Sequence, residues 1–143
     1  MSADISEILR IEDAHLTLPY AASRVKAGFP SPADDYIEKS LDFNEYLIKR
    51  PAATFCVRVS GDSMINAGIH DSDLLIVDRS ITPKHNSIII AVIDGEMTLK
   101  RLIRSKGRVI LQAENPDYPS IIITDEMNFE VWGVVSFVIH RAL

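Results

Sequence analysis

The stretch ATFCVRVSGDSM, residues 53–64, begins like a buried strand and then breaks into a glycine-containing turn. The run from Thr54 to Val59 is rich in β-branched and aromatic residues, which sheet surfaces favour. Gly61 permits a sharp change of direction, and the compact side chain of Ser63 follows directly after Gly61-Asp62. The stretch therefore predicts either an ordinary loop or a turn that presents a serine nucleophile.

Further strand-like segments follow this stretch to the end of the chain. They are rich in Val, Ile and aromatic residues, and they read DLLIVDR (73–79), SIIIAVID (87–94), EMTLKRLI (96–103), RVILQAE (108–114), SIIIT (120–124) and FEVWGVVSFVIH (129–140). Asp94-Gly95 is a type I′ hairpin signal, and Lys106-Gly107 predicts another turn. Because no long helix separates the strands, we predict a mainly β fold with a strongly bent antiparallel body.

The N-terminal third has a different character, with small residues and several prolines. We predict that residues 1–30 form an extended arm lying on the body, and that residues 31–143 form the folded domain. Ser31–Asp34 has the N-cap serine, first-turn proline and early acid of a short helix. Asp42–Glu45 resembles a capping box, and its helix must end near Arg50, because a proline follows.

Composition limits the function classes. The 143 residues are 47% hydrophobic, which is enough for one domain with a proper core, and the net charge of −5 argues against a surface that tracks nucleic-acid phosphates. The single cysteine, Cys56, lies within an apolar run and is more typical of a small core residue than of a catalytic thiol. We find no signal peptide or membrane span, and we expect a cytoplasmic protein.

A serine nucleophile needs a base, and the sequence offers histidines and lysines. Lys100 lies in a largely apolar strand just after the predicted Asp94-Gly95 hairpin, so it is a cation in an unusual setting. None of the histidines has an orienting partner at a fixed spacing: His15, His70, His85 and His140. From spacing alone, the favoured interpretation is structural: Ser63 caps a turn, and Lys100 reaches solvent or pairs with an acid.

Three motifs together resemble the UmuD branch of the LexA-type self-cleaving serine peptidases. They are SGDSMINAGIHDSDLLIVD (60–78), IAVIDGEMTLKRL (90–102) and KAGFPSP (26–32), and they occur in the family's order. The resemblance implies that Ser63 is the nucleophile, that Lys100 is its base and that the chain is cut between Ala27 and Gly28.

Two positions depart from the family pattern. Asn86-Ser87 stands where relatives often have Gly-Asp before the lysine hairpin, and Ser72 stands where the motif DGD is common. Asn tolerates positive φ, so we expect the turn at Asn86 to survive.

The implied chemistry explains the residue types. Desolvation in an apolar strand favours a neutral lysine, which can take the Ser63 proton so that the hydroxyl oxygen attacks the carbonyl carbon of Ala27. Arginine cannot serve as this base, because a guanidinium does not lose its proton in proteins. As in the family, the backbone amides of Asp62 and Ser63 are expected to stabilise the oxyanion. No metal ion or cofactor is expected.

The resemblance also implies partners and a role. We expect a homodimer whose self-cleavage is promoted by RecA filaments on single-stranded DNA, with the 28–143 product joining a UmuC-type polymerase in error-prone translesion synthesis during the SOS response. Direct sequence-specific DNA binding is not expected, since 27 residues are too few for a helix-turn-helix domain. Membrane attachment is not expected either, since no apolar stretch approaches the roughly 18 residues that a membrane span requires. The alternative is a non-catalytic dimeric adaptor of a polymerase with a vestigial dyad. The sequence does not distinguish cleavage within one subunit from cleavage by a dimer partner.

Overall fold

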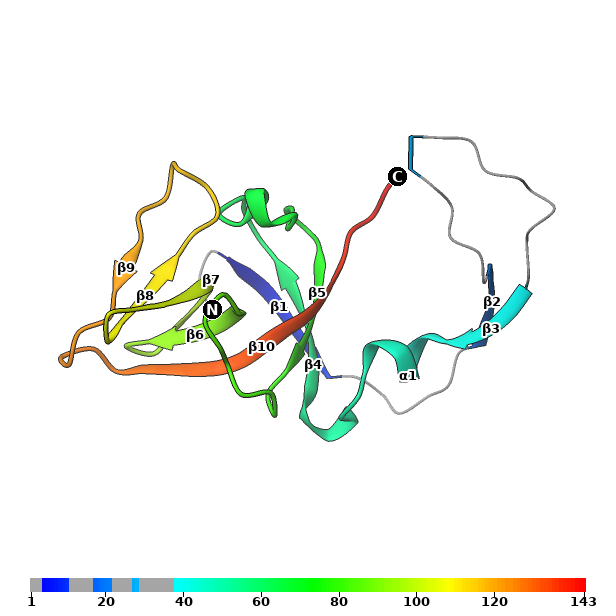
Figure 1. Ribbon diagram of the computed structural model, residues 1–143, viewed down its shortest axis with the longest axis horizontal. Coiled ribbons are helices and arrows are strands. Elements are labelled where there is room, and N and C mark those ends of the chain that lie inside the picture. Colours follow the sequence, from blue (N-terminus) through cyan, green and yellow to red (C-terminus); the bar gives the residue numbers. More distant parts are fainter. Residues whose placement is uncertain (1–3, 11–16, 22–26, 29–37) are drawn as a thin grey trace. The chain divides into compact units, whose positions relative to one another are not determined.

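The computed structural model divides into two compact units, which are described separately (Figure 1). The larger unit contains residues 1–11 and 50–143, and the smaller contains residues 12–49. The residues that the structure describes are 4–10, 17–21, 27–28 and 38–143. The short helix predicted from Ser31–Asp34 lies outside these residues, and the boundary predicted at residue 30 stays a prediction.

The larger unit is built on one eight-stranded antiparallel sheet, in the order β1-β4-β5-β10-β6-β7-β8-β9 (Figure 1). Its strands are β1 (Ile5–Arg10), β4 (Thr54–Val59), β5 (Leu74–Asp78), β6 (Ile88–Ile93), β7 (Glu96–Ser105), β8 (Arg108–Gln112), β9 (Ile121–Ile122) and β10 (Phe129–Ile139). Every strand predicted after residue 53 is present. The register of β10 shifts at Val131/Gly133 and at Val135/Phe137, and such bulges bend a strand. The mainly β, antiparallel prediction is confirmed.

The turns between strands have the predicted backbone conformations. Asp94 and Gly95 have φ values of 48° and 84°, as a type I′ turn requires, and Lys106-Gly107 follows the same pattern. Asn86 has a φ of 72°, so the turn tolerates asparagine as expected. Ser72 also has a positive φ, of 71°, a conformation that glycine adopts without strain.

Strand β1 was not predicted, because the segment was interpreted as part of an arm. Its antiparallel register places Ile5 opposite Val59 and Leu9 opposite Cys56. Ile5 is only 1% exposed and belongs to the core. The beginning of the chain is therefore a strand of the main sheet, and it covers the edge of β4 (Figure 1).

Two buried clusters form the core of the larger unit. The first contains Ile5, Val57, Val59, Met64, Ile69, Leu75, Val77, Ile90 and Leu99. The second contains Ile89, Ala91, Leu102, Leu111 and Val134. Residues from β6 and β7 occur in both clusters, so these two strands are packed on both faces. Full burial of one such aliphatic side chain stabilises the folded state by about 1.5–3 kcal/mol. A shift of the strand register by one residue would move these side chains to the opposite face of the sheet, so their burial fixes the register.

The smaller unit contains strands β2 (Thr17–Ala21) and β3 (Glu38–Asp42), which pair antiparallel, and helix α1 (Phe43–Leu47). The Asp42 side chain accepts a hydrogen bond from the Glu45 backbone N at 3.2 Å, so the predicted N-cap is confirmed. The helix ends at Leu47, slightly before the expected end near Arg50. None of the helices found among the described residues has the length and apolar character needed to cross a membrane.

Candidate active site around Ser63 and Lys100

The turn after β4 presents Ser63 from a firmly held backbone. Gly61 has a φ of 91°, and its amide donates a hydrogen bond to the Asp71 carboxylate at 2.7 Å. Ile65 N donates to Asp62 O at 3.2 Å and closes the turn. The next side chain after Ser63, that of Met64, is buried in the first core cluster. Ser63 is therefore placed by packing as well as by hydrogen bonds, and it is only 4% exposed.

A loop after β8 braces the same turn from the other side. Asn115 Nδ2 donates to Asp62 O at 3.0 Å, and the Tyr118 hydroxyl donates to Asp62 Oδ1 at 2.8 Å. The hydrogen bond to the Asp62 carboxylate, together with its negative charge, raises the pKa of Tyr118 above its usual value. The Tyr118 hydroxyl is thus held as a donor to the Asp62 carboxylate.

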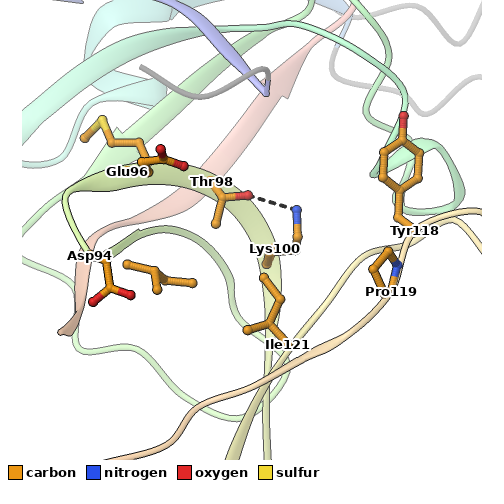
Figure 2. A pocket seen from close by; sticks show the side chains of 9 residues that line it. Asp94, Glu96, Thr98, Lys100, Tyr118, Pro119 and Ile121 are labelled. Atoms are coloured by element: carbon orange, nitrogen blue, oxygen red, sulfur yellow. Dashed lines mark hydrogen bonds between the residues drawn. The ribbon is translucent and has the colours of Figure 1, made fainter. Parts of the chain in front are cut away.

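Lys100 lies on β7 and is 6% exposed. Its Nζ donates to three oxygens, namely Asp4 Oδ2 at 3.2 Å, Thr98 Oγ1 at 2.9 Å and Leu99 O at 3.1 Å. The bond to Thr98 is drawn in Figure 2. Three acceptors match the three N–H bonds of an ammonium group, which has no lone pair to offer as a base.

Asp4 joins the two predicted dyad residues. Its Oδ1 accepts a hydrogen bond from Ser63 Oγ at 3.2 Å, while its Oδ2 accepts from Lys100, from Thr98 Oγ1 at 2.5 Å and from Leu99 N at 3.2 Å. Burial by itself would raise the pKa of Asp4. The Thr98 hydroxyl, the Lys100 charge and the Leu99 amide outweigh that effect, and the pKa is lowered from its ordinary value.

Sequence reasoning missed Asp4 entirely. No local pattern around Asp4 marks it, because its importance depends on the pairing of β1 with β4. The Asp4 carbonyl accepts a hydrogen bond from Ser60 N at 2.8 Å, just before the serine turn. That long-range contact positions the Asp4 carboxylate beside Ser63 and Lys100.

A pocket of about 570 Å³ opens beside Lys100 (Figure 2). In Figure 2, Lys100 and Thr98 lie across the pocket from Tyr118 and Pro119, which come from the facing loop. The lining residues are Ile93, Asp94, Glu96, Met97, Thr98, Lys100, Tyr118, Pro119 and Ile121. A cleft lined by apolar side chains together with a few polar groups is the usual form of a ligand or peptide site.

The other candidate groups fit poorly with catalysis at Ser63. Cys56 is partly buried on β4, and burial raises the pKa of its thiol, which makes the thiolate less available. His85 Nδ1 accepts a hydrogen bond from the Arg104 backbone, whereas His70 and His140 lie against Asp73. His15 lies outside the described residues.

The predicted cleavage site lies in the smaller unit. Ala27 and Gly28 form an exposed turn, and Gly28 has a φ of 87°. The bond between them is thus accessible on the surface of that unit. The oxyanion role of the Asp62 and Ser63 backbone amides, and cleavage at this bond, stay predictions.

Comparison with known proteins gives consistent matches. Residues 19–136 match the family described as Peptidase S24-like. The chain is 48% identical to Protein ImpA of Salmonella typhimurium, over 86% of this chain and 83% of that protein. It is 43% identical to Protein MucA of Escherichia coli, over 95% of this chain and 92% of that protein. LexA repressor 1 of Geobacter sulfurreducens is 42% identical over 78% of this chain and 54% of the repressor.

Proposed function

Because this chain belongs to the Peptidase S24-like family, as its sequence motifs predicted, we propose that it is a serine peptidase that cuts its own Ala27–Gly28 bond. One observation carries the proposal. The Ser63 hydroxyl, from the turn after β4, and the Lys100 amine, from β7, donate hydrogen bonds to the two oxygens of one carboxylate at the edge of a pocket.

The proposed reaction follows the chemistry of a serine and a lysine. Neutral Lys100 takes the proton from Ser63 Oγ, and the oxygen attacks the carbonyl carbon of Ala27. The backbone amides of Asp62 and Ser63 stabilise the oxyanion. The bond between the Ala27 carbon and the Gly28 nitrogen breaks, and Lys100 returns the proton to the departing amine. Water then hydrolyses the ester on Ser63 and releases the 1–27 fragment.

The substrate segment suits the pocket in size. Ala27 and Gly28 place no bulk near the attacked carbon, and both are exposed. A short, extended peptide can lie in a mainly apolar cleft of this volume, next to the lysine at its end.

The likeness to ImpA and MucA supports a role in SOS mutagenesis for the shortened product. In this proposal the protein is a homodimer in the cytoplasm, and RecA filaments on single-stranded DNA promote cleavage. The 28–143 product then serves as a subunit of a UmuC-type translesion polymerase. Removal of residues 1–27 takes away β1 and leaves β4, still paired with β5, as an edge strand whose other side is unpaired, which is a surface suited to a new partner.

One observation favours the alternative of a non-catalytic adaptor. The Ser63 hydroxyl donates its hydrogen bond to Asp4 and not to Lys100, and the Lys100 amine donates hydrogen bonds to three oxygens. Incubation of the purified chain at alkaline pH separates the two functions. A peptidase shortens with time and Ser63→Ala stays full length, whereas an adaptor stays full length in both forms.

A further inference from the structure

The contact between Asp4 and the dyad has a regulatory consequence, which rests on the proposed peptidase function. We propose that β1 is a latch: Asp4 holds Ser63 and Lys100 in a resting state, and β1 must leave before the two can act together. Nucleophilic attack needs the serine proton to pass to a lysine lone pair. In the latched state the serine proton is directed to Asp4, and the three N–H bonds of Lys100 are all used.

The latch is positioned by the strand that carries it. Ile5, next in the chain, is buried in the core, and Ser60 N donates to the Asp4 carbonyl at 2.8 Å. Farther along β1, Glu7 forms an ion pair with Arg58 at 3.1 Å, with both side chains substantially exposed. The carboxylate is therefore fixed beside the dyad by backbone pairing, and its two oxygens satisfy both catalytic groups.

Release of the latch is compatible with the fold. Strand β1 lies at the end of the sheet order and pairs only with β4 among the described strands, so it can separate without breaking any other strand pair. Cleavage after residue 27 also turns β1 into a separate peptide. Its local concentration then falls from the millimolar range typical of a tethered segment to that of the free peptide. Cleavage thus makes the release permanent.

The variant Asp4→Asn tests the latch, with Glu7→Gln as the matched control. Both remove one negative charge from the described segment 4–10, but of the two residues only Asp4 contacts the dyad. We expect Asp4→Asn to speed self-cleavage by about tenfold, because hydrogen bonds to charged groups contribute at least that much. Glu7→Gln should change the rate by less than about twofold, since exposed ion pairs contribute little.

A second readout separates failure of the latch from failure of the peptidase function. Labelling of Ser63 by a fluorophosphonate reports the reactivity of the hydroxyl without any cut in the chain. Faster labelling of Asp4→Asn than of wild type supports the latch even if no chain is cleaved. Equal labelling and cleavage rates in the two proteins, or slower rates in Asp4→Asn, overturn the latch. Equal acceleration by Glu7→Gln also overturns it, because that result reflects general loosening of β1.

A different observation concerns three side chains near the end of β10. Asp73 Oδ1 lies 2.6 Å from His140 Nδ1, and Asp73 Oδ2 lies 3.6 Å from His70 Nδ1. One ligand atom from each residue lies within 4.8 Å of the other two. The Asp73 side chain is 2% exposed, while His70 and His140 are 44% and 50% exposed and stack with ring centroids 4.3 Å apart.

The His70 Nδ1 atom is enclosed by protein and has no hydrogen-bond partner within the described part of the chain. An enclosed polar atom without a partner is unfavourable and needs an explanation. Two imidazoles and one carboxylate are a common ligand set for Zn²⁺ and similar ions. The geometry points to a transition-metal site formed by His70, Asp73 and His140.

The arrangement fits such an ion with small side-chain movements. Ligands at about 2.0–2.2 Å from Zn²⁺ lie roughly 3.3 Å apart in a tetrahedral site, and the two half-exposed imidazoles have room to rotate. Asp73 is already oriented, because its Oδ2 accepts a hydrogen bond from His70 N at 2.7 Å. A bound ion ties the loop before β5 to the chain after β10. Sequence reasoning found no metal site, since 67 positions separate Asp73 from His140.

Titration of the chelator-treated full chain with ZnCl₂ alone, followed by calorimetry, tests this site. We expect one equivalent per chain, and a loss of affinity of about tenfold or more in His70→Ala and in His140→Ala, since each removes a ligand. The control is His85→Ala, because the His85 ring bonds to the Arg104 backbone instead. The melting temperature should rise with Zn²⁺ in wild type and in the control alone. Absence of binding, or binding unchanged in His70→Ala and His140→Ala, overturns the site.

Discussion

The Lys100 amine lies 3.2 Å from the Asp4 carboxylate, although 96 positions separate the two residues in the chain. The contact exists because β1 pairs with β4, and this pairing places Asp4 beside β7, the strand that contains Lys100. The pairing places the Asp4 carboxylate between the Ser63 hydroxyl and the Lys100 amine, with a hydrogen bond from each.

The first prediction concerns the base. Lys100→Ala and Lys100→Arg should both abolish self-cleavage, because alanine has no amine and a guanidinium keeps its proton. Lys100→Arg keeps the positive charge beside Asp4, so its loss of activity cannot be assigned to loss of charge. Cleavage is followed by gel electrophoresis, with folding checked by circular dichroism. Cys56→Ala is the control and should cleave normally; an inactive, folded Cys56→Ala would instead implicate the thiol.

The second prediction concerns the pH dependence of cleavage. A lysine base acts only when neutral, so the rate should rise by about tenfold per pH unit from neutral pH until the neutral form dominates. Rates measured in a series of buffers at constant ionic strength provide the check. A flat profile across this range would argue against a lysine base.

The third prediction concerns stability against acid. Asp78 accepts hydrogen bonds from Ser80 N at 2.8 Å and from Arg50 at 2.9 Å. Burial would raise the pKa of Asp78, but the Ser80 and Arg50 contacts outweigh it and lower the pKa. The carboxylate therefore stabilises the fold above the ordinary Asp pKa of about 3.9, and this contribution is lost as the pH falls through the lower folded-state pKa.

Asp78→Asn should consequently lower the free energy of unfolding by about 1.5–3 kcal/mol at pH 7, since it weakens hydrogen bonds to a charged group. The difference from wild type should shrink in strong acid. Urea denaturation at several pH values measures both quantities. A difference that is the same at every pH would contradict this account of Asp78.

The fourth prediction concerns the bulge in β10. A Cβ atom added at Gly133 would lie 2.5 Å from Val77 Cγ1 and 3.3 Å from Arg79 Cγ. Gly133→Ala should therefore destabilise the protein by about 1–3 kcal/mol through overpacking. Val77→Ala removes the clashing methyl group, so its cost should be smaller in the Gly133→Ala background than in wild type. Additive effects in this double-mutant cycle would show that the clash is relieved elsewhere.

The fifth prediction concerns what cleavage accomplishes. Residues 1–27 contain four acids and three bases, so their removal changes the net charge by only one unit. The structural change is larger, because it uncovers β4 and the neighbours of Ile5. The 28–143 fragment should support more translesion synthesis by a UmuC-type polymerase with RecA than full-length Ser63→Ala does. Equal synthesis by the two forms would show that the arm is not inhibitory.

Most strands of the sheet could be predicted from the sequence, because turns and strands are specified by residues that are close together in the chain. Asp94-Gly95 specifies a tight turn by its backbone conformation, and the β-branched runs on either side specify strands. These features need no knowledge of distant contacts. Cys56 was interpreted as a small core residue, but it is only partly buried and belongs to neither buried cluster.

The parts that were missed depend on long-range pairing. Strand β1 is a short segment with a mixed apolar and charged pattern, and only its pairing with β4 buries Ile5. Asp4 becomes part of the site through that same pairing. The cluster of His70, Asp73 and His140 likewise forms only when the end of β10 lies against β5. The order of residues along the chain contains no direct signal for such contacts.

The most direct test of the central claim is the intact mass of the products when the purified chain is incubated at alkaline pH. We predict two fragments, with the masses of residues 1–27 and 28–143, from the wild-type chain and none from Ser63→Ala under the same conditions. Fragments that end at another bond, or the same two fragments from folded Ser63→Ala, would contradict the account.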